Sequence, residues 1–279
     1  MRRFVAIICA VLVCCGVPAD AQQSDLIPIL GGLAERAQQY YDRFISIICT
    51  ETVHKQDLRS NLMPVGRPRT TVYELSVSRD SSGNDGGTFR VERTLQSVNG
   101  RPARKDQAPE CTDPKTGTPE PLEFLLAHNQ RRYRFALADA AGGPPGARAL
   151  DFEESPPERV RITWAGNCFE ADGGAHKGRV WFDRDSYDVL RVDIRLTKPF
   201  LIPLPEGSFG VRPPLRVEKS ETSLRFSKVD FEQPDETLML PASIETVHVL
   251  RGVPSMRIQQ TLGNYRRFLT KSEIRSGGL

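Results

Sequence analysis

The sequence lacks the motifs that identify common enzyme classes. No GxSxG, HExxH, P-loop or Rossmann glycine pattern occurs in its 279 residues. The four histidines, His54, His128, His176 and His248, lie far apart, and none has a second metal ligand at a typical spacing. We therefore expect a protein that is not an enzyme and that needs no cofactor and no metal.

It also lacks an excess of charge of one sign. Lysine and arginine number 38 against 35 aspartates and glutamates, a formal charge of +3. The strongly basic footprint typical of nucleic-acid-binding proteins is missing, so no nucleic-acid partner is expected. After residue 17 no apolar run approaches the length needed to cross a bilayer, and we expect no transmembrane segment once the N-terminal signal is removed.

Cysteine is scarce, and three of the six cysteines lie in the first 15 residues. That region has Arg2 and Arg3, an apolar run over 4–17 and a small-x-small pattern ending at Ala21. This order predicts a signal peptide over 1–21, cleaved after Ala21, and a periplasmic or secreted single domain over 22–279. The alternative, a lipid anchor at Cys14 or Cys15, fits less well because neither cysteine follows a small residue.

The mature chain retains Cys49, Cys111 and Cys168, an odd number. In an oxidising compartment this predicts one disulfide and one further thiol, and three pairings are open. We favour Cys111–Cys168, because both lie in polar loop sequence whereas Cys49 follows an apolar helix-like run. Metal binding by these cysteines is less favoured because no CxxC spacing occurs.

Two segments show helical periodicity. Apolar residues recur every three or four positions from Leu26 to Ile48, which predicts a helix that is firmest over 33–46, with Ser24 or Asp25 at its N-cap. A second helix is expected over 121–137. Proline-rich insertions lie near 102–121 and 199–214, where a central strand is excluded.

Most of the remaining chain alternates apolar and polar residues, as strands do. The segments 50–58, 70–79, 89–98, 160–164, 178–194, 216–231, 238–251 and 255–268 follow this pattern, and Asn99-Gly100 is a strong turn signal. We therefore predict an α+β fold, mainly β, in which two or so helices cover the concave face of a curved antiparallel sheet. Such a half-barrel has either a filled core or a pocket for a hydrophobic ligand.

Five segments occur in an order that resembles known proteins. They are FISIICTET (44–52), LQSVNGRPAR (95–104), KGRVWFDRDSYDVLRVDI (177–194), LMLPASIETVHV (238–249) and NYRRF (264–268). The set resembles a group of uncharacterised secreted bacterial proteins with a Phe-x-Cys-x-Glu start and an Asn-Tyr-Arg-x-Phe end. The matching residues are Cys49, Glu51, Trp181, Asp183, Leu240, Pro241, Asn264, Tyr265, Arg266 and Phe268.

The order is also similar to the LolA-like superfamily of periplasmic lipoprotein carriers. That resemblance implies a half-open sheet closed by helices, and binding of a lipid, an acyl chain or a lipoprotein without catalysis. The hypothetical ligand-lining residues are the apolar ones on the expected inner face: Tyr73, Leu75, Phe89, Val160, Ile162, Trp164, Trp181, Val192 and Ile194. The alternative is an envelope or surface protein-interaction scaffold with a filled core, whose partner contacts the proline-rich insertions.

Overall fold

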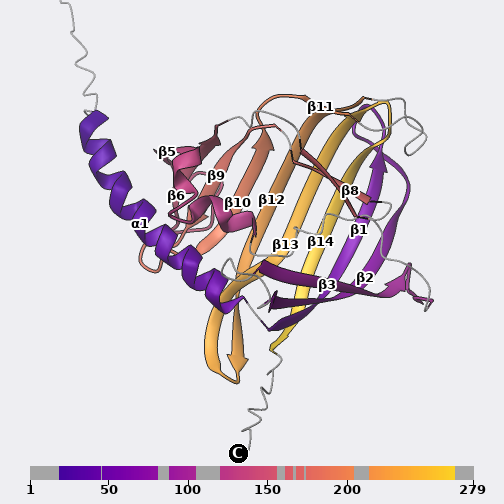
Figure 1. Ribbon diagram of the computed structural model, residues 1–279, viewed down its shortest axis with the longest axis horizontal. Helices are drawn as coiled ribbons and strands as arrows, with labels where there is room; N and C mark the ends of the chain where they lie inside the picture. Colours follow the sequence, from indigo (N-terminus) through magenta and orange to yellow (C-terminus); the bar gives the residue numbers. More distant parts are fainter. Residues whose placement is uncertain are drawn as a thin grey trace, which may run out of the picture.

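The described part of the chain forms one long antiparallel sheet with a single α-helix against it (Figure 1). In this computed structural model, the described residues are 19–44, 46–80, 88–104, 120–155, 161–165, 168–172, 174–203 and 214–267. Twelve strands form the sheet, in the order β4-β3-β2-β1-β14-β13-β12-β10-β9-β6-β5, with β11 paired to β12 beside β10. The mainly β, antiparallel prediction is confirmed.

The strands of this sheet have the following bounds: β1 Ile47–Leu58, β2 Pro64–Asp80, β3 Thr88–Val98, β4 Arg101–Pro102, β5 Tyr133–Ala138, β6 Arg148–Glu154, β9 His176–Phe182, β10 Val189–Leu196, β11 Phe200–Ile202, β12 Leu215–Glu232, β13 Asp235–Arg251 and β14 Ser255–Arg267. Two further strands, β7 Arg161–Ala165 and β8 Cys168–Asp172, form a separate hairpin.

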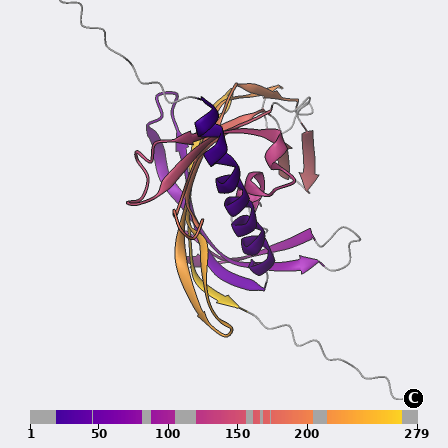
Figure 2. The same ribbon diagram turned by 90° about the vertical axis from the view of Figure 1, so that its left-hand side faces the viewer.

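The sheet is strongly curved, and the helix α1 (Ala19–Arg43) lies on its concave side (Figures 1 and 2). α1 crosses the side of the sheet formed by β5, β6, β9 and β10, together with two short 3-10 helices, η1 (Glu120–Leu125) and η2 (Gln130–Arg132). The β7–β8 hairpin lies on the same side, in front of the opposite part of the sheet. None of the helices among the described residues is long and apolar enough to cross a membrane.

Alternating side chains give the sheet two unlike faces. On β1, Ile47, Cys49, Glu51 and Val53 are buried, and the residues that alternate with them are partly exposed. Their neighbours on the adjacent strands continue the pattern, so the concave face carries the hydrophobic core and the outer face carries polar and charged side chains. The core joins Leu33 of α1 and Leu125 of η1 to the sheet.

The predicted turn at Asn99-Gly100 is confirmed. Both residues have positive φ, +49° and +76°, as a tight turn between β3 and β4 requires. Asn99 also accepts a hydrogen bond from the backbone N–H of Thr70 through its side chain, at 2.9 Å.

The helices differ from the prediction. α1 begins at Ala19 and ends at Arg43, so the expected caps at Ser24 and Asp25 lie inside it, and the predicted cleavage after Ala21 falls in its first turn. Cleavage itself remains a prediction.

The second predicted helix, over 121–137, is not an α-helix. Its first part forms η1 and η2, and its last part is strand β5. Tyr133, Phe135 and Leu137 alternate with more exposed neighbours, a two-residue period that competes with the helical spacing of Leu122, Leu125 and Leu126. The described part of the chain therefore has one α-helix, not two.

Candidate functional site

The turn between β9 and β10 holds α1 against the sheet. Within it, Asp183 accepts backbone hydrogen bonds from Asp185 at 3.0 Å and Ser186 at 2.9 Å, and these bonds lower the pKa of its carboxyl below the usual value. Tyr187, two residues after Asp185, has a positive φ of 58°, and its ring stacks on the ring of Phe182. The polar segment of the hairpin is thus a rigid turn.

Two contacts join this turn to the helix. The Tyr187 ring lies so close to Gly32 of α1 that a Cβ on that glycine would be 2.8 Å from ring carbons. Arg36, one helical turn later, donates to Asp188 at 2.6 Å, and Asp188 also accepts from the Ser186 hydroxyl. Packing and an ion pair therefore fix α1 over β9 and β10.

The space between α1 and the sheet is nearly filled. Leu33, Ala37 and Ile29 of the helix are buried in one cluster with Phe182 and Val189. The cavity left between α1, β10, β12 and β13 encloses only about 30 Å³, roughly room for one or two waters. This cavity is too small for an acyl chain.

Beyond the helix, the concave face continues over β12, β13, β14 and β1. One row of neighbouring side chains on it runs from Ile194 through Thr222 and Thr246 to Ile258, each pair directly opposite across adjacent strands. Ile194 and Ile258 are only partly buried. This row offers a mixed apolar and hydroxyl surface, and its Thr246 and Ile258 lie on strands beyond those that α1 crosses.

A buried ion pair crosses the concave face further along the strands. Glu51 of β1 is fully buried, and Arg93 of β3 donates to it at 2.8 Å and 3.4 Å. Gln260 of β14, also buried, donates to the same carboxylate at 2.6 Å. The Glu51 carboxylate has hydrogen-bond partners on both sides. Its structural role is therefore to hold β1, β3 and β14 together within an apolar core.

Two further residues of the resemblance, Cys49 and Tyr265, lie near Glu51. Tyr265 donates its hydroxyl hydrogen to the carbonyl of Pro241 at 2.5 Å, and the Cys49 thiol is within hydrogen-bonding reach of the same hydroxyl. Burial, with the Glu51 charge as a lesser cause, raises the pKa of Cys49 to about 12. The Cys49 thiol is free, buried and un-ionised at neutral pH, so it is not an activated nucleophile.

Two tyrosine hydroxyls of the interior have no hydrogen-bond partner among the described residues. They belong to Tyr40 of α1 and Tyr73 of β2. Burial raises the pKa of Tyr40 well above its ordinary value. A buried polar group of this kind requires a physical reason, and a ligand oxygen would supply one.

The predicted lining residues fall into three groups. Tyr73, Leu75 and Val192 are fully buried on the concave face, and Ile194 is partly buried there. Val160 lies outside the described residues. For three others the backbone alone is described, and they are Phe89 in β3 and Ile162 and Trp164 in β7.

Trp181 is on the outer face, opposite to its buried neighbours Val180 and Phe182. It is buried beneath the β5–β6 loop, where a Cβ at Gly143 would lie 2.0 Å from the ring, and Arg191 stacks on it at 4.9 Å. Both sides of this strand are apolar because the β5–β6 loop covers its outer side. Strand periodicity in the sequence does not reveal such a contact.

The outer face carries a groove of about 850 Å³ across β5, β6, β9, β10, β12 and β13. Charged residues that mostly pair with one another line it, as Arg179 does with Asp151 at 2.7 Å. Lys177 and Arg195 face each other across β9 and β10, and neither has an ion pair among the described residues. Apolar side chains, among them Phe135, Trp181 and Val247, line the groove together with these charged residues.

The remaining predictions concern cysteine and metal. Cys111 lies outside the described residues, and only the backbone of Cys168 is described, so the Cys111–Cys168 disulfide remains a prediction. Most of both proline-rich insertions, residues 105–119 and 204–213, also lies outside. Within the described ranges, no three residues of His, Cys, Asp or Glu come together as metal ligands would.

The fold and the concave face define this protein as an open, curved antiparallel sheet whose apolar side is partly covered by one helix. No protein-family model and no curated protein matches the sequence. Among solved structures, the chain is similar to the crystal structure of LolA superfamily protein NE2245 from Nitrosomonas europaea, with 10% identity and a TM-score of 0.37. That match covers 86% of this chain and 94% of the other.

Proposed function

We propose that this chain is a periplasmic or secreted protein, not an enzyme, that binds a hydrophobic ligand such as an acyl chain on the concave face of its sheet. The observation that carries the proposal is the difference between the two faces. The concave face carries the hydrophobic core, with polar groups such as Thr246 and Glu51 among the apolar ones, while α1 covers only the part formed by β5, β6, β9 and β10. Ile258 of β14, beyond that cover, is only partly buried and keeps exposed apolar surface.

The interior also suits a ligand with one polar end. The hydroxyl of Tyr73 is a buried donor without an acceptor among the described residues, and an ester or carboxyl oxygen is the kind of acceptor it lacks. Such a ligand would gain about 25 cal/mol for each Å² of apolar surface removed from water. The sequence resemblance to LolA-like carriers implies the same class of ligand, and the predicted signal peptide is consistent with the periplasmic location of such carriers.

Probe binding with two matched variants tests the proposal. Ile258 points to the concave face and Val247, on the adjacent strand, to the outer groove. We expect N-phenyl-1-naphthylamine to bind saturably and to be displaced by palmitate. Ile258→Gln should weaken this binding roughly tenfold, because it places a polar amide on the apolar face, whereas Val247→Gln should leave it nearly unchanged.

Three results would contradict the proposal: no saturable binding, loss of binding in Val247→Gln alone, or a protein that carries no extractable lipid in native mass spectrometry after purification from its own envelope. Loss in Val247→Gln alone would place the ligand in the outer groove.

A protein-interaction scaffold is the second candidate, because the space under α1 is nearly filled. In that case a protein partner would bind the wild type and fail to bind a variant lacking residues 204–213, while the lipid probe would bind neither.

A further inference from the structure

Exposed apolar side chains concentrate at one end of the sheet. Five large apolar residues are exposed in the described part of the chain, and four of them are Leu62, Met63, Val65 and Leu201, exposed by 39%, 59%, 43% and 49%. They lie in or next to the β1–β2 turn and in β11, far apart in sequence. The fifth, Ile27, is on α1.

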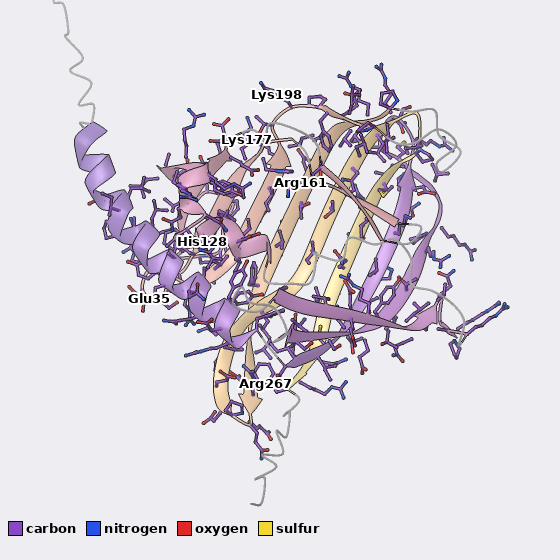
Figure 3. The ribbon with its side chains drawn as sticks, in the orientation of Figure 1. Glu35, His128, Arg161, Lys177, Lys198 and Arg267 are labelled. Carbon is purple, nitrogen blue, oxygen red and sulfur yellow. The ribbon has the colours of Figure 1, made fainter. Side chains whose placement is uncertain are left out.

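Three segments come together at this end. The last residue of β1, Leu58, pairs with Ser255 at the start of β14, which places the β1–β2 turn beside the β13–β14 turn. Arg216 of β12 pairs with Arg251 on one side and Leu201 on the other. Phe200 and Ile202 of β11 form one apolar cluster with Val253. In Figure 1 all three lie at the upper end of the sheet, and Figure 3 labels Lys198 there.

The charges of these segments have one sign. The segments are RSNLMPVGR (59–67), RGVP (251–254) and KPFLIP (198–203), and they contain four cationic residues and no carboxylate. Arg59, Arg67 and Lys198 form no ion pair with any described residue, and Arg251 is 76% exposed and 3.9 Å from Glu218. We name this surface, made of residues 59–67, 198–203 and 251–254, the basic apolar end.

The β1–β2 turn presents its apolar residues in a fixed conformation. Arg59 and Met63 are joined by a backbone hydrogen bond of 2.8 Å, and Asn61 accepts from the Met63 N–H at 3.1 Å. Leu62 has φ +63°, a conformation that favours Gly or Asn. A large apolar side chain is therefore held in water, in a strained backbone conformation, where a turn residue would be more stable.

We propose that the basic apolar end docks on an anionic lipid bilayer, with Leu62, Met63 and Leu201 entering the headgroup region and the cations contacting lipid phosphates. Apolar side chains surrounded by Arg and Lys suit an anionic bilayer, because membrane binding combines burial of apolar area with attraction to anionic lipid. Each cation near such a surface strengthens binding by about fivefold. The proposal uses none of the residues that carry the proposed ligand site.

Co-sedimentation with vesicles tests it, using the full mature chain. The vesicles are phosphatidylcholine alone, or phosphatidylcholine with phosphatidylglycerol. We expect binding to the anionic vesicles that weakens as salt is added. The double variant Leu62→Asn and Met63→Gln should reduce the partition coefficient roughly tenfold or more, and Asn suits the left-handed backbone of position 62, so the turn should persist.

The matched control is Ile27→Gln, which replaces an exposed apolar side chain on α1, away from this end. It should bind vesicles as the wild type does. The proposal is overturned if the wild type does not bind anionic vesicles at low salt, if it binds neutral vesicles equally well, or if Ile27→Gln loses as much binding as the turn variant. N-phenyl-1-naphthylamine binding by the same variants, expected to be unchanged, separates this result from failure of the ligand site.

Discussion

At the scale of single residues, Glu51 and Arg93 are the most consequential pair. Glu51→Gln leaves the Arg93 guanidinium, whose side chain is 9% exposed, without a countercharge in an apolar surrounding. We expect a loss of about 3–5 kcal/mol in the free energy of unfolding, measured with urea. Arg134→Gln is the control, since its pair with Glu153 is exposed and should contribute close to nothing.

Replacing both partners gives the sharper outcome. Glu51→Leu with Arg93→Met removes the two charges together, and should recover most of the stability lost in Glu51→Gln. A double variant that is less stable than Glu51→Gln would contradict this account of the pair.

The thiol of Cys49 gives a pH dependence with a definite sign. Its pKa is about 12 in the folded chain against 9.0 for an unperturbed thiol, so the unfolded state releases the proton first. The stability contributed by the neutral thiol is complete below pH 9 and is lost as the pH rises towards 12. We expect Cys49→Ala to reduce the fall in unfolding free energy above pH 9, by at most about 1.4 kcal/mol per pH unit. The unfolding free energy is measured by urea titration at each pH. If it falls equally with pH in the wild type and in Cys49→Ala, this prediction is contradicted.

At the scale of elements, the docking of α1 can be tested with adjacent glycines. Gly31→Ala meets no atom within 4 Å and should stabilise the protein by about 0.5–1 kcal/mol through helix propensity. Gly32→Ala should not, because its Cβ would press on the Tyr187 ring. We expect a lower melting temperature and faster amide exchange in α1 for Gly32→Ala. Equal melting temperatures of the two variants would show that the Tyr187 ring moves aside at no cost in stability.

The sequence predicted elements better than contacts. Two-residue periodicity located the long strands, because one face of each packs on the core and the other meets water. It failed where two periods compete, at Tyr133–Ala138, and where a loop covers the outer face, at Trp181. The cluster of Glu51, Arg93 and Gln260 spans 209 residues of chain, and no local pattern reports a contact between side chains that distant.

At the scale of the whole molecule, charge is separated along the strands. The basic apolar end lies where β12 begins and β13 ends, and the hairpin tip that joins them at the opposite end has four carboxylates within residues 230–236. Figure 1 shows this hairpin projecting from the lower end of the sheet, with Arg267 labelled near it in Figure 3. An anionic surface would therefore attract one end and repel the other, although the formal charge is only +3.

Two double variants that change net charge by equal amounts test this orientation. Arg59→Gln with Arg67→Gln removes two cations from the basic apolar end, and should weaken binding to anionic vesicles by about tenfold or more. Glu232→Gln with Asp235→Gln removes two anions from the exposed hairpin tip, which an oriented molecule holds several Debye lengths from the lipid, and should change binding less than about twofold. If the second variant strengthens binding as much as the first weakens it, net charge alone governs attraction and the molecule has no preferred orientation on the bilayer.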